Sequence, residues 1–491
     1  MRRSVFCLIL AALAAVPLAA KAAPSTDKLW QALTRTDVEA AYRLLKDNHP
    51  GAVAETGDRT FATALEMAHR RALGRAAAVT TYPGYLATLG EFAGAMGDAH
   101  IGSRALYEPA VIRWPGFVAA KRGDAWVVAK EDRNLAGTNL AGARIASCAG
   151  VPAEKWAREV LRFHTIAAVA ALQVVHAQWL LLDDGNPFVT WPDACTFDVD
   201  GTRKTVPLRW TRIARDAFEK SYAVSAYGHA GFGFGRWRDG YWIAMEHLTP
   251  EAGPVVDAAR KNEAALRAAP YVIVDLRGNG GGDDSYGLHL SEALYGRAHV
   301  DAVLGATDSD GGCHSIWRAS AQNIAAAAET VEFFARHGDT DGEKAYRRAI
   351  KEMKTAMAAG RPLTGPAICH DKTETAPHTA PSKMKGRVIV ITDSLCFSSC
   401  IGTMGYFHAL GAVQVGVETG ADTHYSEYRR IVLPSGLSTF STLQAMMPDA
   451  PLHLGPYAPK PEFTFAGDIA DTEAVKAWIV RIVLPATAQR R

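Results

Sequence analysis

The chain has 491 residues, of which 48% are hydrophobic and 21% are charged. This composition excludes disorder over most of the length, because so many apolar side chains can offset the entropy cost of ordering the chain. The 53 Lys and Arg residues nearly balance the 51 Asp and Glu residues, so no basic surplus points to nucleic acid or an acidic membrane surface. The length predicts two or three domains.

The first 22 residues have the pattern of an export signal. Arg2 and Arg3 precede an apolar run over residues 5–16, and small residues form a cleavage site that ends at Ala22. The run is shorter than the roughly 20 residues that span a bilayer. We therefore expect cleavage after residue 22 and a periplasmic or secreted protein with no stable membrane insertion. An uncleaved anchor or a buried first helix is the alternative.

The cysteines support the same compartment. Of seven cysteines, Cys7 lies in the predicted signal, and an even number is left in an oxidising environment, which favours disulfides. The remaining cysteines are Cys148, Cys195, Cys313, Cys369, Cys396 and Cys400. Cys313 and Cys369 each precede a histidine and could bind zinc, but their spacing matches no known finger. A disulfide between these two is the preferred interpretation; the pairing of the others stays open.

Residues 23–105 are predicted to form a helical region. A capping box at Thr36–Glu39 predicts a helix start, because the threonine and glutamate side chains can satisfy each other's free backbone N–H groups. Apolar residues then follow at helical spacing until His49-Pro50 ends the helix. A second amphipathic face covers residues 86–96 and stops at Gly97.

Residues 106–239 show sequence patterns of both strands and helices. Short strands are expected at 126–129 and 144–147, and a long helical stretch at 153–182. A hairpin is predicted from Cys195 to Leu208, with Asp200-Gly201 as its turn.

From residue 240 to 491, short apolar strands alternate with helices. The expected strands cover residues 241–244, 271–274, 388–391 and 413–417. Continuous apolar strands separated by helices predict a mainly parallel or mixed sheet that is covered on both faces. A helical insertion is expected within residues 320–385, and its tail over 372–385 reads as a mobile loop.

The first loop that could carry chemistry is Asp275–Gly282. Its three successive glycines follow a buried strand, so backbone N–H groups could approach a ligand closely. The loop lacks the lysine–serine pair of a phosphate loop and the dinucleotide fingerprint. Two interpretations are left, an oxyanion hole for acyl transfer or a tight turn without function.

The second loop is Asp393–Cys400, which follows the expected strand at 388–391. A serine at a strand-to-helix turn is held rigidly, and the helix N-terminus stabilises nearby negative charge. Such a serine is a candidate nucleophile. Ser398 or Ser399 could equally be a helix cap, and composition does not separate the two roles.

The third loop is Gly97–Gly102, where the N-terminal helices end. Its histidine, His100, is a candidate general base, because the pKa of an imidazole lies near working pH. Taken alone, a single histidine in a loop is more often structural or exposed.

The order of these three loops resembles the tail-specific or C-terminal processing serine peptidases of peptidase family S41 and their tricorn-core relatives. The resemblance implies an α/β (α+β) multidomain fold with a helical region at 23–105 and a PDZ-like β-rich region at 106–239. Residues 240–491 would form a ClpP/crotonase-like α/β catalytic core. The segment Ala143–Pro152 is similar to the end of the PDZ-like module, which captures peptide termini in relatives.

Carried over by motif, the resemblance makes Ser398 the nucleophile, with Ser399 in the position that is usually alanine. The oxyanion would then accept hydrogen bonds from the N–H of Ser399 and from that of Gly281 or Gly282. The family implies no metal and no organic cofactor.

The chain departs from the family pattern in three places. Phe397 is larger than the usual residue before the serine, and Ile401 stands where a glutamate is usual. The family's lysine base normally lies in a turn that corresponds to residues 416–424, but no lysine occurs between Lys385 and Lys460. The missing lysine argues against a serine–lysine dyad.

The tricorn-like branch instead uses a serine–histidine pair that an acid orients, and its histidine matches Asp98-Ala99-His100. The resemblance therefore makes His100 the general base, with His424 as the rival. Glu427 is the predicted orienting acid and Glu462 the alternative, although neither spacing is diagnostic.

The sequence thus predicts an exported serine endopeptidase that hydrolyses polypeptides through a Ser398 acyl-enzyme, with His100 as general base. The missing lysine favours the alternative, a catalytically inactive relative that keeps the cleft as a binding site. An esterase that uses the same serine is a third, weaker hypothesis.

Overall fold

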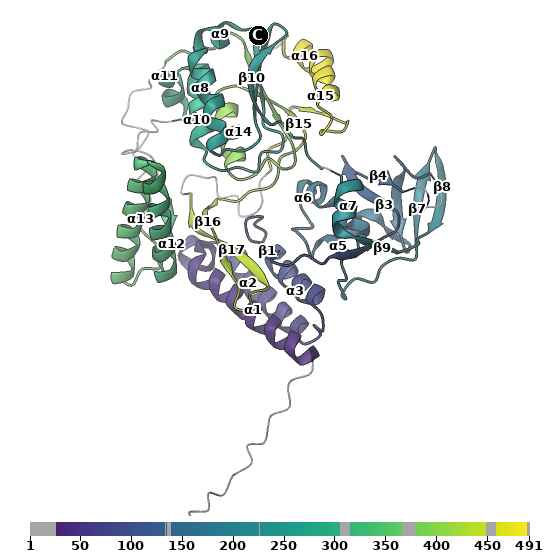
Figure 1. Cartoon of the computed structure of the whole chain (residues 1–491). Helices are drawn as coiled ribbons and strands as arrows, with labels where there is room; N and C mark the ends of the chain where they lie inside the picture. Colours follow the sequence, from purple (N-terminus) through teal and green to yellow (C-terminus); the bar gives the residue numbers. More distant parts are fainter. Residues whose placement is uncertain are drawn as a thin grey trace, which may run out of the picture.

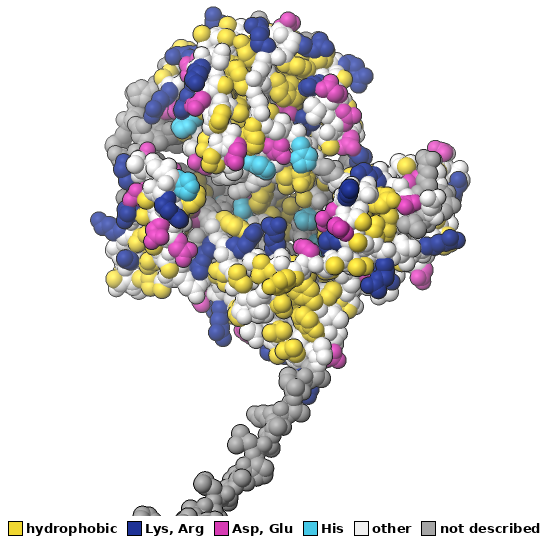
Figure 2. All heavy atoms as spheres, in the orientation of Figure 1, with side chains coloured by type: hydrophobic (Ala, Val, Ile, Leu, Met, Phe, Trp, Pro, Cys, Tyr) yellow, Lys and Arg dark blue, Asp and Glu magenta, His cyan; other side chains and the backbone are white. Residues whose placement is uncertain are grey.

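The computed structural model describes residues 26–132, 134, 139–224, 226–304, 315–365, 380–447 and 458–488. Figure 1 shows an α/β core above an N-terminal helical unit, with a β-rich unit on one side and a helical hairpin on the other. Figure 2 shows a hollow between these parts, with histidine side chains gathered around it. Among the described helices, none has the length and the apolar run needed to cross a membrane.

The N-terminal unit packs helices against a small antiparallel sheet in which β17 pairs with each of the other strands. The helices are α1 (Thr26–Asn48), η1 (Pro50–Ala52), η2 (Ala54–Thr56), α2 (Arg59–Ala76) and α3 (Tyr82–Gly94), and the strands are β1 (Ser103–Ala105), β13 (Ile316–Trp317), β16 (Tyr425–Val432) and β17 (Ser438–Met446). Leu45, Leu89, Phe92 and Phe440 belong to the core between them. The helical region therefore folds around strands from the far end of the chain.

The predicted helix start at Thr36 is wrong, because α1 already begins at Thr26. Thr36 lies exposed in the middle of the helix, and its neighbour Asp37 is buried. Asp37 accepts hydrogen bonds from Tyr85 and from the backbone of Ser435. A polar side chain within the predicted capping box therefore makes tertiary contacts, in the middle of a longer helix.

The β-rich unit is a twisted antiparallel sheet in the order β3-β4-β5-β7-β8, with short elements packed on it. Its strands are β2 (Val111–Trp114), β3 (Phe117–Arg122), β4 (Ala125–Glu131), β5 (Arg144–Cys148), β6 (Val151–Pro152), β7 (Ala194–Val199), β8 (Thr202–Pro207) and β9 (Thr211–Ala214), and its helices are α5 (Ala153–Leu161), α6 (Ala170–Val175), η3 (Ala177–Leu181) and α7 (Arg215–Ser221). The hairpin predicted around Asp200-Gly201 is confirmed, with φ of 50° and 76° at the two turn residues.

The single long helix expected at 153–182 is wrong, because the stretch is broken between α5 and α6. In the break, the carbonyl groups of Phe163 and Thr165 lie directly against Gly90 and Gly94 of α3. The two glycines leave room for this backbone contact, and it places the segment in a non-helical path. Tertiary packing here overrides the helical periodicity.

The core sheet has the order β10-β11-β12-β14-β15-β18 and is parallel except for β10 at its edge. Its strands are β10 (Phe232–Trp237), β11 (Gly240–Met245), β12 (Tyr271–Asp275), β14 (Arg387–Thr392), β15 (Val413–Gly416) and β18 (Phe463–Thr464), and its helices are η4 (Pro250–Ala252), α8 (Gly253–Lys261), α9 (Glu263–Ala268), α10 (Ser285–Tyr295), α11 (Arg297–Leu304), α14 (Ser399–Ala409), α15 (Thr472–Trp478), η5 (Ile479–Val483) and α16 (Leu484–Ala488). The predicted mixed sheet is confirmed.

Alternate residues of the buried strands face two separate hydrophobic cores. Val272 and Val388 point into the core under α8, α10 and α14, whereas Ile273 and Ile389 point into the core under α15 and η5. Helices therefore cover both faces of the sheet (Figure 1), as the continuous apolar strands indicated.

The expected insertion contains two helices, α12 (Ala321–His337) and α13 (Thr340–Ala358). Two disulfides are formed among the described residues, Cys148–Cys195 and Cys396–Cys400. The pair expected between Cys313 and Cys369 and the loop expected over 372–379 lie outside the described residues.

We expect His49 to make the protein acid-sensitive. Its ring is buried and stacks on Phe61, and burial lowers the pKa of His49 from 6.5 to about 3. Between these pH values the unfolded chain binds a proton at this site and the folded chain does not. The free energy of unfolding therefore falls as pH drops from 6.5, with a limiting slope of about 1.4 kcal/mol per pH unit for one group.

The matched variant is His49→Asn, which keeps an acceptor for the Gly51 N–H that the His49 Nδ1 now accepts at 3.0 Å. Urea unfolding at several pH values should give a shallower acid slope for the variant, whatever its stability at pH 7. Equal slopes in the two proteins would show that His49 does not carry this acid sensitivity.

Candidate active site

Ser398 lies at a sharp turn between strand β14 and helix α14. Its backbone has φ 57° and ψ −131°, a conformation that costs energy for any residue except glycine. Ser398 is the N-cap residue of α14, yet its side chain makes no capping hydrogen bond. The hydroxyl is therefore not used to hold the helix end, which favours the nucleophile over the cap.

The glycine loop packs directly against this turn. A Cβ atom added to Gly281, where φ is 97°, would lie 2.9 Å from the Ser398 Cβ and 3.0 Å from the Ser399 nitrogen. Only glycine permits this approach. In addition, the Ser399 Oγ donates a hydrogen bond to the Gly282 carbonyl at 2.7 Å. The loop and the serine turn thus form one unit, although they are far apart in sequence.

The same contacts distinguish the two candidate oxyanion donors of the glycine loop. The Gly281 N–H donates to the Asn279 Oδ1 at 2.9 Å and is therefore occupied. The N–H groups of Gly282 and Ser399 donate no hydrogen bond to another group in the described part of the chain. The geometry favours Gly282, together with Ser399, as the pair that would stabilise an oxyanion.

His100 follows helix α3 and presents its Nδ1 atom to two carboxylates. Nδ1 lies 3.2 Å from the Asp98 Oδ1 and 3.3 Å from the Asp422 Oδ1. Burial opposes a charged ring, but the hydrogen bond and charge of Asp98, with the charge of Asp422, outweigh it and raise the pKa of His100 above its ordinary value. With Nδ1 engaged in this way, Nε2 is the nitrogen left to exchange a proton with a nucleophile.

The two acids differ in their environments. Asp98 is buried; burial opposes its ionisation, but hydrogen bonds from His100 and Thr423 outweigh this and lower the pKa of Asp98. Burial raises the pKa of Asp422 to about 6, although His100 and the backbone N–H groups of Thr423 and Ser398 work against that rise. Asp98 is therefore the acid that stays ionised beside the imidazole.

One cavity, with a volume of about 790 Å³, brings these groups together. His100, Ser398, Ser399, Gly282 and Asp422 all line it. Phe397, which is larger than the family pattern, lies beside the site, with its ring centroid 4.3 Å from that of His100. The bulky residue therefore supports the histidine. His424 also lines the cavity and packs on Tyr425, with ring centroids 4.1 Å apart.

The structure does not place the expected orienting acid on His100. Glu427 lines the cavity, but its carboxylate accepts a hydrogen bond from Tyr346 of α13, and burial raises the pKa of Glu427. The alternative, Glu462, directly precedes strand β18 and does not line the described cavity. Asp98 and Asp422 occupy the orienting position instead.

Sequence reasoning used Asp98 only as part of a motif and missed Asp422. A signal was available, because Asp422 lies in the turn at 416–424 where the family lysine is absent. The turn therefore still lies beside the general base, but it supplies a carboxylate in place of the family's lysine.

Asp393 holds the loops of the site in place from behind. Its Oδ2 accepts the N–H groups of Gly228 and Gly278, each at 2.8 Å, and its Oδ1 accepts that of Leu395 at 3.0 Å. One buried carboxylate thus ties the start of the glycine loop to the segment that leads to Ser398.

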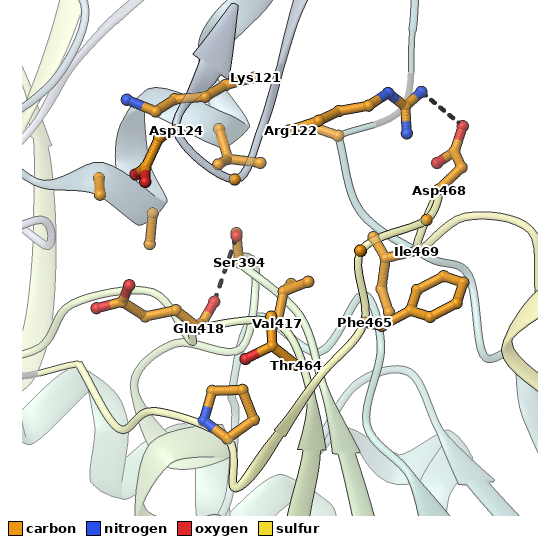
Figure 3. Close-up of a pocket in the computed structure, with 18 of the residues that line it drawn as sticks. Lys121, Arg122, Asp124, Ser394, Val417, Glu418, Thr464, Phe465, Asp468 and Ile469 are labelled. Carbon is orange, nitrogen blue, oxygen red and sulfur yellow. Dashed lines mark hydrogen bonds and ion pairs between the residues drawn. The ribbon is translucent and has the colours of Figure 1, made fainter. Parts of the chain in front are cut away.

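A second cavity, of about 450 Å³, lies between the β3–β4 turn of the β-rich unit and the core. Figure 3 shows Arg122 and Asp468 at its edge, joined by an ion pair of 2.9 Å. Neither Ser398 nor His100 lines it. In the described part of the chain, no group of three or more His, Cys, Asp or Glu side chains is arranged to hold a metal ion. The cavity of about 790 Å³, which Ser398 and His100 line, is therefore the candidate active site.

Comparison with known proteins finds a family match over part of the chain. Residues 245–449, which include the glycine loop and the serine turn, match the model of peptidase family S41. A search of curated proteins finds no match. Among solved structures, mature CPAF in complex with lactacystin superposes with a TM-score of 0.61 at 12% identity, covering 93% of this chain and 99% of that one. A second structure of mature CPAF has a TM-score of 0.57 at 12% identity, covering 91% of this chain and 96% of that one.

The site and the family match define a serine-type peptidase, a class of hydrolase. The match covers residues 245–449, so the similarity to peptidase family S41 is shown for that part of the chain. The similarity to CPAF, at this low identity, shows that the two proteins share their fold.

We expect Asp98→Asn to lower the pKa of His100. In the wild type that pKa should lie above 6.5, because the Asp98 hydrogen bond and charge outweigh burial. Without the Asp98 charge, less opposes the effect of burial, which disfavours the charged ring. The imidazole should therefore lose its proton at a lower pH. The measurement is an NMR titration of the imidazole protons, with His100→Gln to assign the signal. An unchanged pKa would mean that Asp98 does not control the base.

Proposed function

We propose that this protein is an exported serine endopeptidase that hydrolyses peptide bonds of polypeptides, with Ser398 as nucleophile and His100 as general base. One observation carries the proposal. Ser398, in its strained turn, and His100, held through Nδ1 by two carboxylates, line the same cavity. A nucleophile, a base and an acid that orients the base are the three groups that acyl transfer by serine requires.

The proposed reaction starts when the Ser398 Oγ attacks the scissile carbonyl carbon while the His100 Nε2 takes the hydroxyl proton. The carbonyl oxygen becomes an oxyanion and accepts hydrogen bonds from the N–H groups of Ser399 and Gly282. Asp98 stabilises the imidazolium that forms, because its carboxylate is ionised and touches Nδ1.

The tetrahedral intermediate collapses when His100 gives its proton to the leaving amine, which leaves an acyl-enzyme on Ser398. Water then enters, loses a proton to His100 and attacks the ester carbonyl. Collapse of the second intermediate releases the acid product and returns the proton to the Ser398 Oγ. Only groups of this chain and water take part in these steps.

The missing family lysine is what favours the inactive alternative, a binding protein that keeps the cleft. Against that alternative, the carboxylates in and near the turn hold His100, so the cavity retains a base. Asp422 lies in the turn itself, and its neighbour Thr423 donates a hydrogen bond to Asp98.

For the remaining parts we propose that residues 1–22 direct export to the periplasm or outside the cell. The β-rich unit within 106–239 would act as a PDZ-like module that captures polypeptide substrates. Its antiparallel sheet, with α5 packed beside β5, supports this role. The Cys148–Cys195 disulfide supports an oxidising destination.

The test of the proposed function is hydrolysis of an unfolded protein by the purified chain and its variants. Ser398→Ala and His100→Ala should each lower kcat/KM by a factor of about 10³ or more. His424→Ala should keep most of the activity, because His424 lies outside the proposed proton path. Ser394→Ala is the matched control, since its hydroxyl donates to the Glu418 carbonyl at the second cavity (Figure 3).

Loss of activity in His424→Ala but not in His100→Ala would show that His424, in the turn at 416–424, is the general base. Equal activity in Ser398→Ala and the wild type would exclude Ser398 as nucleophile. Serine-dependent hydrolysis of small acyl esters, without any cleavage of polypeptides, would indicate an esterase instead.

A further inference from the structure

The described disulfide Cys396–Cys400 encloses the proposed nucleophile. Ser398 lies midway between the two cysteines, and both cysteines are fully buried beneath the half-exposed turn. The closed loop also contains Phe397, whose ring packs against that of His100 in a tilted arrangement, and Ser399, whose N–H is a proposed oxyanion donor. The nucleophile, one oxyanion donor and one support of the base therefore lie within a single covalent ring.

By chain entropy, this disulfide should stabilise the fold less than the Cys148–Cys195 disulfide does. The loop-closure entropy removed from the unfolded chain grows with the length of the closed loop, and Cys396 and Cys400 are separated by only 4 positions. The Cys148–Cys195 disulfide closes a separation of 47 positions and joins paired strands β5 and β7. The short crosslink also constrains the local geometry of the residues that it encloses.

The local geometry that needs support is the backbone of Ser398. Its φ of 57° is unfavourable for a residue with a side chain, so neighbouring contacts must hold it. Single hydrogen bonds hold the flanks, including the Gly420 N–H to the Cys396 carbonyl at 2.9 Å and the Phe397 N–H to the Asn279 carbonyl at 3.3 Å. The crosslink is the covalent constraint across Ser398 itself.

We propose that the Cys396–Cys400 disulfide is a positioning element that switches this site on, so that hydrolysis requires the oxidised pair. The proposal rests on the proposed function of Ser398. When the pair is reduced, the turn can relax toward ordinary backbone angles, which moves the Ser398 Oγ and the Ser399 N–H away from the reacting carbonyl. The chain then stays inactive until its thiols meet an oxidant.

The chemistry is thiol–disulfide exchange. Activation removes two electrons and two protons from the two thiols and passes them to a disulfide oxidant, which becomes a dithiol. In the reverse direction, one thiolate of a dithiol attacks a cysteine sulfur and forms a mixed disulfide. That attack releases the other cysteine as a thiolate, and the second thiol of the reductant then attacks the mixed disulfide, closes the reductant's own ring and releases the remaining cysteine.

The experiment compares Cys396→Ala/Cys400→Ala with the matched control Cys148→Ala/Cys195→Ala. Thermal unfolding shows that each variant is folded, and steady-state kinetics on a peptide separate kcat from KM. The 396/400 variant should lose kcat by a factor of about 10², as expected for a small misplacement of reacting groups, with KM nearly unchanged. The control should keep its kcat.

The wild type provides a second measurement that does not depend on folding of the variant. Treatment with dithiothreitol, followed by mass spectrometry of alkylated cysteines, gives the fraction of reduced Cys396 and Cys400. The kcat should fall in proportion to that fraction and return on reoxidation with oxidised glutathione. Unchanged kcat in fully reduced, folded protein, or in the folded 396/400 variant, would overturn the proposal.

A readout without turnover separates this proposal from the proposed function. Because the Phe397 ring packs against the His100 ring, the NMR signals of the His100 ring should shift in the 396/400 variant and not in the control. Inactivity of the oxidised wild type, combined with that shift, would refute the peptidase and retain the positioning role. No shift would refute the positioning role itself.

Discussion

The candidate site depends on the contact that joins Asp98 to the turn at residues 416–424. Asp98 accepts a hydrogen bond from Thr423, which lies 325 positions away, and its other oxygen holds His100. Asp422 approaches the same imidazole from the core. The base belongs to the N-terminal helical unit and the nucleophile to the core, and this contact helps to hold the two units together at the site.

The electrostatics of the contact follow from burial and pairing acting in opposite directions. Burial favours the neutral form of each group, yet the neighbouring anions keep His100 basic and the neighbouring donors keep Asp98 ionised. Burial dominates at Asp422, which takes a proton more readily. Because Asp98 is ionised beside it, His100 can accept the proton of Ser398. The site therefore has a general base although the family's lysine is absent.

Local patterns predicted the parts of the fold that local physics controls. The strands of the core, the Asp200-Gly201 hairpin and the loop–strand order around Gly281 and Ser398 were all readable from the sequence. The broken helix after Leu161 was not, because its cause is close backbone contact with two glycines of α3. Asp422 was missed for the same kind of reason. No spacing within a segment reveals which acid a distant histidine will meet.

The measurement that tests the central claim most directly is covalent labelling with a fluorophosphonate at a series of pH values, with the modified residue identified by peptide mapping. The account predicts a single adduct on Ser398, whose rate of formation rises with pH as the His100 imidazolium loses its proton. That rise should vanish in His100→Ala while the protein stays folded. An adduct on Ser399 or elsewhere, or a pH dependence that His100→Ala leaves unchanged, would contradict the serine–histidine site.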